Sequence, residues 1–413
     1  MDQGVAKLPR GFEDRLDLSR HATPRPLRTT PIHKWFVFPH SFSDVLVNSL
    51  IEHWRLNEEC RIYDPFVGAG TTLLAAKARR IAAIGSDISP LSVFVTNAKV
   101  ARYSVGKLES TWKNIQQAMK SLSLPSRLRR TQFLAKALEL ETHRNLAGVR
   151  RVIESVADGS EKRFFALALL RLLPHYSRAL PDGGWFRWRR VRSRADTVPL
   201  RFTRMVSGMI ADLRSGTSNG LKGDWHACKH DARVPLEGYG HFDAVISSPP
   251  YPNRHDYTRI FTTELLFQFL DDTGLKKLRY ENLRSHVEAR TVPCDLNGWK
   301  PPTSAKTVLD GIEDVRDKRI PRMIRGYFED MHLTLAALKK VTRRGGHIAL
   351  VVGNVQHAGV HVPVDSILAD LGKQVGLEWE ETWVIRLRGN SAQQMERYGR
   401  KPARESVVMF RRP

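Results

Sequence analysis

The sequence has 413 residues, of which 41% are hydrophobic, and a formal net charge of +23 at pH 7. A chain of this length can form one large domain or two, each with a sizeable core. The charge excess indicates a polyanionic partner such as nucleic acid. No apolar run is long enough to span a membrane, and the N-terminus lacks a signal-peptide core. The three cysteines are too widely spaced for a disulfide framework, so a reducing cytoplasm is expected.

The first part of the chain predicts an arm followed by a short aromatic element and a helix. Residues 1–34 contain Pro, Arg and Thr without periodicity, which is typical of an arm that is poorly ordered or straps onto a domain. A Phe-Pro element follows at 35–42. Apolar spacing then predicts a helix over 44–54.

The next stretch predicts a strand, a glycine turn and a helix. A short apolar run at 61–63 leads into Asp64-Pro65-Phe66-Val67-Gly68-Ala69-Gly70-Thr71-Thr72, and a helical run continues to position 80. Glycines let a ligand approach the backbone closely, and the free N–H groups of a helix start add polar donors. A second apolar run at 81–85 ends near Asp87, whose carboxylate can accept hydrogen bonds from both hydroxyls of a ribose.

Two related nucleotide-binding patterns do not fit this turn. A Walker loop would need a lysine after the last glycine, and Thr71 stands there. The dinucleotide fingerprint would need a third glycine, and position 73 is Leu. A cofactor with an adenosine but no pyrophosphate fits better, and S-adenosylmethionine is the common one. The turn by itself is also compatible with an ordinary strand-to-helix connection.

A basic helical insertion is predicted over 102–220, after a helix at 89–101 that Ser89 can cap. Residues 102–216 hold 23 Lys and Arg against 9 Asp and Glu, which gives +14 of the total charge. Within them, a loop after Gly183-Gly184 interleaves aromatic and basic side chains, which can contact phosphates and stack on bases. A solvated basic face is the alternative. The candidate nucleic-acid contacts of this loop are Trp185, Arg187, Trp188, Arg189 and Arg190.

The sheet is predicted to resume near 222. Asp224, His226, Cys228 and His230 alternate there, but ligands on one flat strand do not converge tetrahedrally, so no metal site is expected. A buried strand at 243–247 then runs directly into Ser248-Pro249-Pro250-Tyr251.

The pairing of "DPFVGAGTT" with "SSPPY" resembles the S-adenosylmethionine-dependent amino-methyltransferases of DNA. The resemblance implies a doubly wound, Rossmann-like α/β sheet and transfer of a methyl group to an exocyclic base nitrogen. Serine at the first position of the tetrapeptide resembles the cytosine-N4 branch, although many cytosine-N4 enzymes have the opposite motif order. The family resemblance also implies an acidic residue that accepts a hydrogen bond from the adenine amino group of the cofactor. Asp231 is the candidate for this residue, and Asp224 is the alternative. The cofactor-binding candidates are Asp64, Phe66, Gly68, Gly70, Thr71, Thr72, Asp87, Ile88 and Asp231.

The tetrapeptide has a clear chemical interpretation. The Ser248 hydroxyl and the Pro249 carbonyl can accept the two hydrogens of an amino group and direct its lone pair toward the methyl group. Pro250 keeps the backbone rigid, and Tyr251 offers a face for stacking. The target atom is inaccessible in a duplex, so the nucleotide must be flipped out. The polar and aromatic loop that follows, with Arg254 and Tyr257, is a candidate wall of the base pocket and a nucleic-acid contact.

The remaining sequence predicts a second surface insertion at 271–320, a long helix at 320–340, a strand at 347–352, a helix at 363–375 and two closing strands. Pro293-Cys294 is incidental, because it follows no apolar strand. The predicted catalytic domain therefore comprises 35–101 and 221–412. We expect a DNA cytosine-N4 methyltransferase, alone or with a restriction endonuclease. Adenine-N6 methylation of DNA, guanine-N2 methylation of RNA and a non-catalytic basic nucleic-acid-binding protein are the alternatives.

Overall fold

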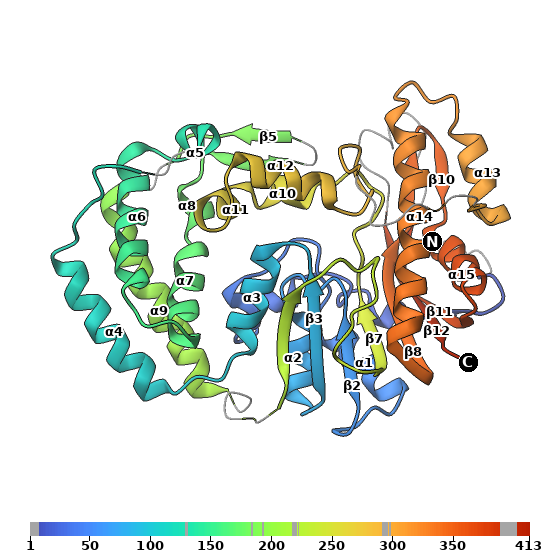
Figure 1. The fold of residues 1–413 in the computed structure, drawn as a ribbon, viewed down its shortest axis with the longest axis horizontal. Coiled ribbons are helices and arrows are strands. Elements are labelled where there is room, and N and C mark those ends of the chain that lie inside the picture. The colour runs from blue at the N-terminus through green and yellow to red at the C-terminus, as the bar shows by residue number, and fades with distance from the viewer. Residues whose placement is uncertain are drawn as a thin grey trace, which may run out of the picture.

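A computed structural model describes residues 8–128, 131–182, 185–191, 194–216, 221, 223–290, 296, 299–388 and 403–413. Its centre is an eight-stranded sheet in the order β1-β11-β12-β8-β7-β2-β3-β6, with helices on both faces (Figure 1). Pro293 and Cys294 lie outside the described residues. No helix of the described chain has the length and apolar character needed to cross a membrane.

Five neighbouring strands are parallel and carry the site. They form because short apolar runs end in turn residues, and β-α-β connections place successive strands in one direction. Strand β2 pairs with β3 on one side and with β7 on the other. The strand order reverses beside β2, and ligands bind at such a switch point in open α/β sheets. These strands are β2 (Arg61–Asp64), β3 (Ala82–Asp87), β6 (Trp225–Lys229), β7 (Phe242–Ser247) and β8 (Thr342–Gly353).

The other edge of the sheet is closed by both ends of the chain. Strand β12 (Ala403–Arg411) runs antiparallel between β8 and β11 (Glu378–Arg388). Strand β1 (Phe12–Asp14) pairs in parallel with β11, with Phe12 opposite Thr382. The described part of the N-terminal arm is thus a strap, which covers an edge that would otherwise expose unpaired backbone groups.

Side chains alternate across the sheet into two cores. Ile62 and Ala83 face one core, and Tyr63 and Ile84 face the other. The first core is covered by α1 (Asp44–His53), α2 (Thr71–Ala78) and α3 (Pro90–Val100). The second is covered by α13 (Thr303–Gly311), α14 (Arg319–Val341) and α15 (Val364–Gln374).

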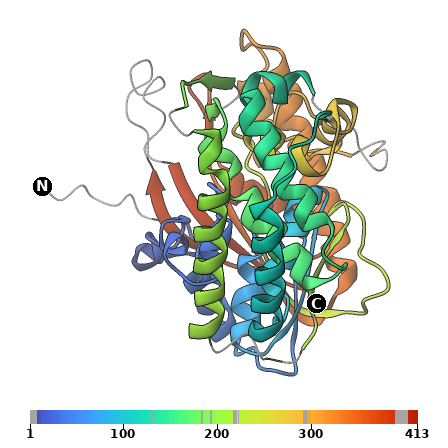
Figure 2. The ribbon, with the colours of Figure 1, turned by 90° about the vertical axis from the view of Figure 1, so that its left-hand side faces the viewer.

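The predicted basic insertion is mainly helical and packs beside α3. Its helices lie alongside one another in Figure 2 and share the first core, with Phe164 and Phe202 fully buried. One prediction was wrong in part: the first four residues of the aromatic–arginine stretch, Trp185–Trp188, form a strand that pairs with β4 in a hairpin and not a loop. The insertion comprises α4 (Val105–Lys120), α5 (Gln132–Ala137), α6 (Leu140–Glu154), α7 (Ser160–Leu170), α8 (Leu173–Tyr176), β4 (Ala179–Asp182), β5 (Trp185–Trp188) and α9 (Val198–Ser215).

Three short helices roof the carboxyl ends of the parallel strands (Figure 1). They are α10 (Tyr257–Ile260), α11 (Thr262–Gln268) and α12 (Asp272–Glu281). A small hairpin of β9 (Val355–His357) and β10 (Val360–Val362) follows β8. The predicted fold class, a doubly wound Rossmann-like sheet with a large helical insertion, is confirmed.

Candidate active site

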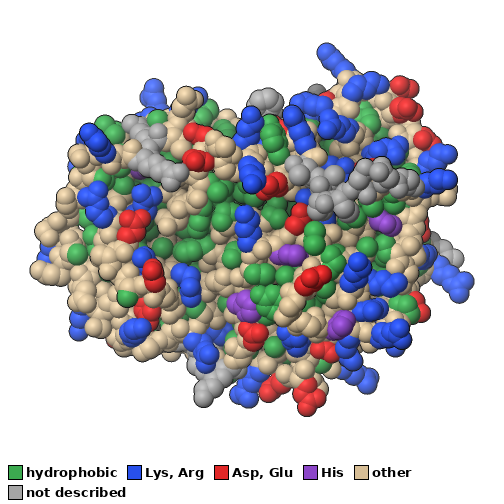
Figure 3. Space-filling model, viewed as in Figure 1, with side chains coloured by type: hydrophobic (Ala, Val, Ile, Leu, Met, Phe, Trp, Pro, Cys, Tyr) green, Lys and Arg blue, Asp and Glu red, His purple; other side chains and the backbone are tan. Residues whose placement is uncertain are grey.

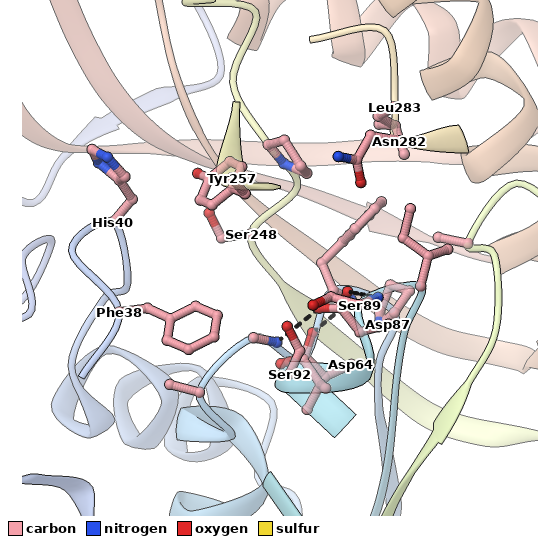
Figure 4. Close-up of a pocket in the computed structure, with 18 of the residues that line it drawn as sticks. Phe38, His40, Asp64, Asp87, Ser89, Ser92, Ser248, Tyr257, Asn282 and Leu283 are labelled. Carbon is pink, nitrogen blue, oxygen red and sulfur yellow. Dashed lines mark hydrogen bonds between the residues drawn. The ribbon is translucent and has the colours of Figure 1, made fainter. Parts of the chain in front are cut away.

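A cavity of about 1060 Å³ lies between the carboxyl ends of β2, β3 and β7 and the helical roof. Figure 4 shows the carboxylates of Asp64 and Asp87 at one end, His40 at the other and Ser248 between them. The glycine turn and the Ser-Pro-Pro-Tyr turn therefore open into one cavity. Its polar lining includes His40, Ser41, Asp64, Thr71, Asp87, Ser89, Ser92, His230, Asp231, Ser248, Tyr257, Thr258, Glu281 and Asn282.

Glycines at and beside the turn are required by backbone conformation at some positions and by close packing at others. Gly68 and Gly70 have φ of 47° and 79°, a left-handed region that disfavours a side chain. A Cβ on Gly70 would also lie 2.9 Å from Thr96 Oγ1. Gly85 of β3 has an ordinary φ, but a Cβ there would lie 2.4 Å from Val67 Cγ2. The turn is thus packed closely against the neighbouring strand.

Two carboxylates anchor this end of the cavity. Asp64 is 3% exposed and accepts hydrogen bonds from Ser247 Oγ at 2.5 Å and from the Phe66 N–H at 3.1 Å. Burial raises the pKa of Asp64 to about 6. Asp87 accepts from the N–H groups of Gly68 and Ser89, and burial raises its pKa as well. A ligand with hydroxyl or cationic groups fits these acceptors.

Ser248 has a fixed orientation. Its hydroxyl donates to the Val351 carbonyl of β8 at 2.9 Å. A hydroxyl has one hydrogen and two acceptor lone pairs. Because the hydrogen is engaged with β8, the oxygen can act only as an acceptor toward a group in the cavity.

Asp231 is held by a buried guanidinium. Arg233, whose side chain is 2% exposed, donates to Asp231 from Nε at 3.0 Å and from Nη2 at 2.8 Å. Its Nη1 reaches the fully buried Asp330 of α14 at 3.3 Å. Two parallel N–H···O bonds fix the plane of a carboxylate. Asp231 therefore lines the cavity in one orientation, tied to the core on the second face of the sheet.

Lys99 connects the Phe-Pro element to the glycine turn. Its Nζ, on the buried side of α3, donates to the Phe36 carbonyl at 2.6 Å and to the Ala69 carbonyl at 3.0 Å. Burial, and then the charge of Arg171, lower the pKa of Lys99 to about 7. The Phe38 ring packs on Phe261 of the roof with ring centroids 4.3 Å apart. These contacts close one side of the cavity.

Aromatic rings surround the other end. His40 lies 4.8 Å from His255 and 5.8 Å from Tyr257 between ring centroids. Asp256 fixes the start of α10 by accepting from the Thr258 N–H at 2.8 Å. The cavity thus has an acidic end, a hydroxyl acceptor in the middle and an aromatic end.

Curated proteins resemble the chain over nearly its whole length. It is 27% identical to Type II methyltransferase M.BsoBI of Geobacillus stearothermophilus over 438 aligned residues, covering 92% of this chain and 86% of the relative. It is also 27% identical to Type II methyltransferase M.AvaI of Nostoc sp. over 430 residues, covering 94% and 87%. The chain is thus similar to Type II methyltransferases over most of its length. The predicted resemblance to S-adenosylmethionine-dependent DNA methyltransferases is confirmed, and S-adenosylmethionine is the methyl donor.

No protein-family model matches the methyltransferase. Among solved structures, the rRNA methyltransferase aviRa of Streptomyces viridochromogenes aligns with a TM-score of 0.33 and 12% identity, covering 96% of this chain and 94% of that one.

Most of the predicted cofactor-binding residues line the cavity, but Gly70, Thr72 and the alternative acid Asp224 do not. Gly70 and Thr72 support the turn from behind, with the Thr72 hydroxyl bonded to the Ile246 carbonyl at 3.3 Å. Asp224 pairs instead with His226 at 2.7 Å, away from the lining. The lining residues among the predicted set are Asp64, Phe66, Gly68, Thr71, Asp87, Ile88, Asp231, Ser248, Pro250 and Tyr257.

The other predicted contacts lie around the cavity rather than in it. Pro249 is buried, and Tyr251 packs against the second core. Arg254, with φ of 72°, pairs with Asp317 at 3.2 Å. In the hairpin, Arg187, Trp188, Arg189 and Arg190 are exposed, while the side chain of Trp185 lies outside the description. Among the described residues, no three potential metal ligands come together.

Two parts of the site were not predicted. Leu278, Glu281, Asn282 and Leu283 line the cavity, although their segment was expected to be a surface insertion. Leu275 and Leu278 are buried at helical spacing, a signal that could have indicated a packed helix. Lys99 stands in a helix whose neighbouring positions are apolar, a pattern that could have indicated a buried lysine.

Proposed function

We propose that this protein is a site-specific DNA methyltransferase that transfers a methyl group to the exocyclic N4 amino group of a flipped-out cytosine. The observation that carries the proposal is the orientation of Ser248, whose oxygen is left as an acceptor inside the cavity that the glycine turn also lines. Serine rather than aspartate at this position favours cytosine N4. The basic charge of the chain supports DNA as the partner.

The chain's own residues would activate the amino group by positioning it. The lone pair of an exocyclic amine is delocalised into the ring, so the nitrogen must be drawn toward tetrahedral geometry before it can react. Ser248 Oγ would accept one N–H. The carbonyl of Pro249, which stands between the two lining residues Ser248 and Pro250, would accept the other. S-adenosylmethionine, when bound, supplies an electrophilic methyl group. No covalent bond to the protein is needed.

The cavity fits the cofactor's functional groups. Asp87 would accept from the ribose hydroxyls, and Asp231 from the adenine amino group. Gly68 lines the cavity without a side chain, so it would allow a ligand to approach the backbone closely. Asp64 supplies negative charge beside a cationic ligand.

The aromatic end would receive the flipped base. Tyr257 and His40 line it, and their rings offer faces for stacking. The exposed hairpin residues Arg187, Trp188 and Arg190 are proposed DNA contacts beyond the roof. We propose that residues 35–101 and 221–412 form the catalytic domain. The insertions 102–220 and 271–320 would recognise the DNA sequence, and a restriction endonuclease would be a partner.

The test is Ser248→Ala. Because the lost contact acts on the amino group and not on the cofactor, we expect methyl transfer to unmethylated bacterial DNA to fall about 10²–10³-fold. Calorimetric affinity for S-adenosylmethionine should stay within twofold. Ser41→Ala is the matched control, since Ser41 lines the same cavity but donates to its own loop at Phe38, and it should retain transfer. Equal losses of transfer and cofactor affinity in Ser248→Ala would make Ser248 a structural residue and refute the proposed role.

A further inference from the structure

A second hollow, of about 840 Å³, lies between the N-terminal segment and helices α7 to α9. Figure 2 shows the dark-blue N-terminal segment beside the light-green helix α9. No lining residue is shared with the cofactor cavity. We name it the arginine pocket. It is lined by five cations (Arg28, Lys34, Arg171, Arg201 and Arg204), by Asp212 as its one carboxylate, and by Trp35, Leu172, His175, Met205, Gly208 and Met209.

The one carboxylate is already engaged. Asp212 accepts from Lys34 Nζ at 2.7 Å through one oxygen and from the buried Trp35 Nε1 at 2.9 Å through the other. Arg28, Arg201 and Arg204 make no side-chain hydrogen bond or ion pair within the described chain. Three guanidinium groups thus converge on one hollow without anionic partners.

The cations are close enough to influence one another. Burial, and then the charges of Arg171, Arg201 and Arg189, lower the pKa of His175. Burial lowers the pKa of Arg171. The negative charge of Glu264 partly offsets this effect, and the positive charge of Arg28 lowers the pKa further. Such a cluster of like charges destabilises the fold unless an anion binds. Many other described arginines, such as Arg79 with Glu52, form an ion pair with an acidic residue.

The chemistry of the pocket fits phosphate groups. A guanidinium presents a planar fork of donors that matches phosphate oxygens bidentately. The five cations that line the pocket exceed what one small carboxylate would need. The insertion that provides α7 to α9 also carries most of the excess positive charge.

The pocket lies close to the active cavity along the chain. Trp35 lines the pocket, and Phe38, three positions further on, lines the cavity. Three residues span at most about 11 Å. That length corresponds to about three base steps of a DNA strand.

We propose that the arginine pocket binds backbone phosphates of the DNA substrate, a few nucleotides from the flipped base. The inference rests on the proposed function for the identity of the polymer. Binding there would also hold the segment 28–35 against α9, and this segment continues directly into the wall of the cofactor cavity.

The test compares Arg201→Gln/Arg204→Gln with a charge-matched control, Arg55→Gln/Arg344→Gln, whose exposed arginines lie at the amino ends of β2 and β8. Fluorescence anisotropy of full-length protein with S-adenosylmethionine is measured on a labelled 30-base-pair mixed-sequence duplex across a KCl series. Each phosphate contact contributes about 0.9 to the slope of log affinity against log salt. The pocket variant should therefore lose about 1.8 of slope, two contacts at about 0.9 each, and bind at least tenfold more weakly at low salt.

Calorimetry with S-adenosylmethionine should give wild-type affinity for both variants, which shows that both are folded. Equal slopes for the pocket variant and its control would overturn the proposal. An unchanged DNA slope, together with binding of inorganic pyrophosphate that only the pocket variant loses, would assign the pocket to a small phosphate and overturn it as well. Failure of wild-type protein to label bacterial DNA would instead refute the proposed function, independently of the slopes.

Discussion

The substitution Gly85→Ala tests whether the close contact between Gly85 of β3 and Val67 positions the glycine turn. Gly85 lies in β3 with an ordinary φ, so an alanine causes no backbone strain there. The added Cβ would lie 2.4 Å from Val67 Cγ2 and 2.9 Å from Val67 Cβ, about 1 Å inside ordinary contact. Val67 immediately precedes Gly68, so relief of the clash must move the cofactor turn.

The expected cost follows from overpacking. Inserting a methyl group into a packed core lowers the folding stability by about 1–3 kcal/mol. Replacing a glycine within a strand raises the folding stability by up to about 1 kcal/mol, which offsets part of this loss. We expect a net loss of about 1–2 kcal/mol in urea unfolding. A displacement of the turn by the same free energy lowers affinity for S-adenosylmethionine about tenfold.

A double-mutant cycle locates the cause. Val67→Ala removes Cγ2, so the Gly85→Ala/Val67→Ala protein should recover at least half of the lost affinity, with a coupling of about 1 kcal/mol. Gly106→Ala is the control, because a Cβ at Gly106 of α4 meets no atom within 4 Å. Wild-type stability and cofactor affinity in Gly85→Ala, or no coupling to Val67, would refute the reasoning.

Two further predictions concern buried charges. Burial raises the pKa of Asp64 from 3.8 to about 6, so ionisation above pH 6 destabilises the cofactor-free fold. Asp64→Asn should therefore stabilise the protein at pH 8, by at most about 3 kcal/mol, but not at pH 4, and an equal effect at both pH values would contradict this. Arg233→Gln removes the guanidinium that Asp231 and Asp330 share, while Asp330 keeps its ion pair with Arg284, so urea unfolding should show a loss of about 1–3 kcal/mol and cofactor binding should weaken. The exposed pair of Arg319 and Asp317 provides the control Arg319→Gln, and equal midpoints for the two variants would contradict the buried-pair argument.

The sequence predicted those parts of the site that depend on local chemistry. A strand, a turn with two left-handed glycines and a helix follow one another within twenty residues, so their geometry is encoded in neighbouring positions. The buried strand before Ser248 places that residue at the carboxyl edge for the same reason. The helical insertion was predicted because its apolar spacing is regular over several turns.

The parts that escaped prediction depend on long-range contacts. The Asp231–Arg233–Asp330 network joins residues 97 positions apart, and the Lys99 bridge joins α3 to Phe36, 63 positions away. The roof segment around Asn282 reads as polar and broken, and only its packing over the strands makes it a cavity wall. A three-residue strand carries no pattern of its own, so the sequence does not distinguish a disordered N-terminal arm from a docked one.

The surface seen in Figure 3 shows why the charge total alone could not locate the DNA-binding face. Lys and Arg side chains are spread over both halves of this view, with Asp and Glu between them and hydrophobic side chains toward the middle. The proposed contacts therefore rest on where cations lack partners and not on their number.

The most direct test of the central claim is the identity of the methylated nucleoside. Unmethylated bacterial DNA is incubated with the protein and methyl-labelled S-adenosylmethionine, hydrolysed to nucleosides and separated by chromatography with mass detection. We predict that the label co-migrates with N4-methylcytosine. Label in N6-methyladenine would contradict the assignment of the base, and label found only in RNA would contradict DNA as the substrate.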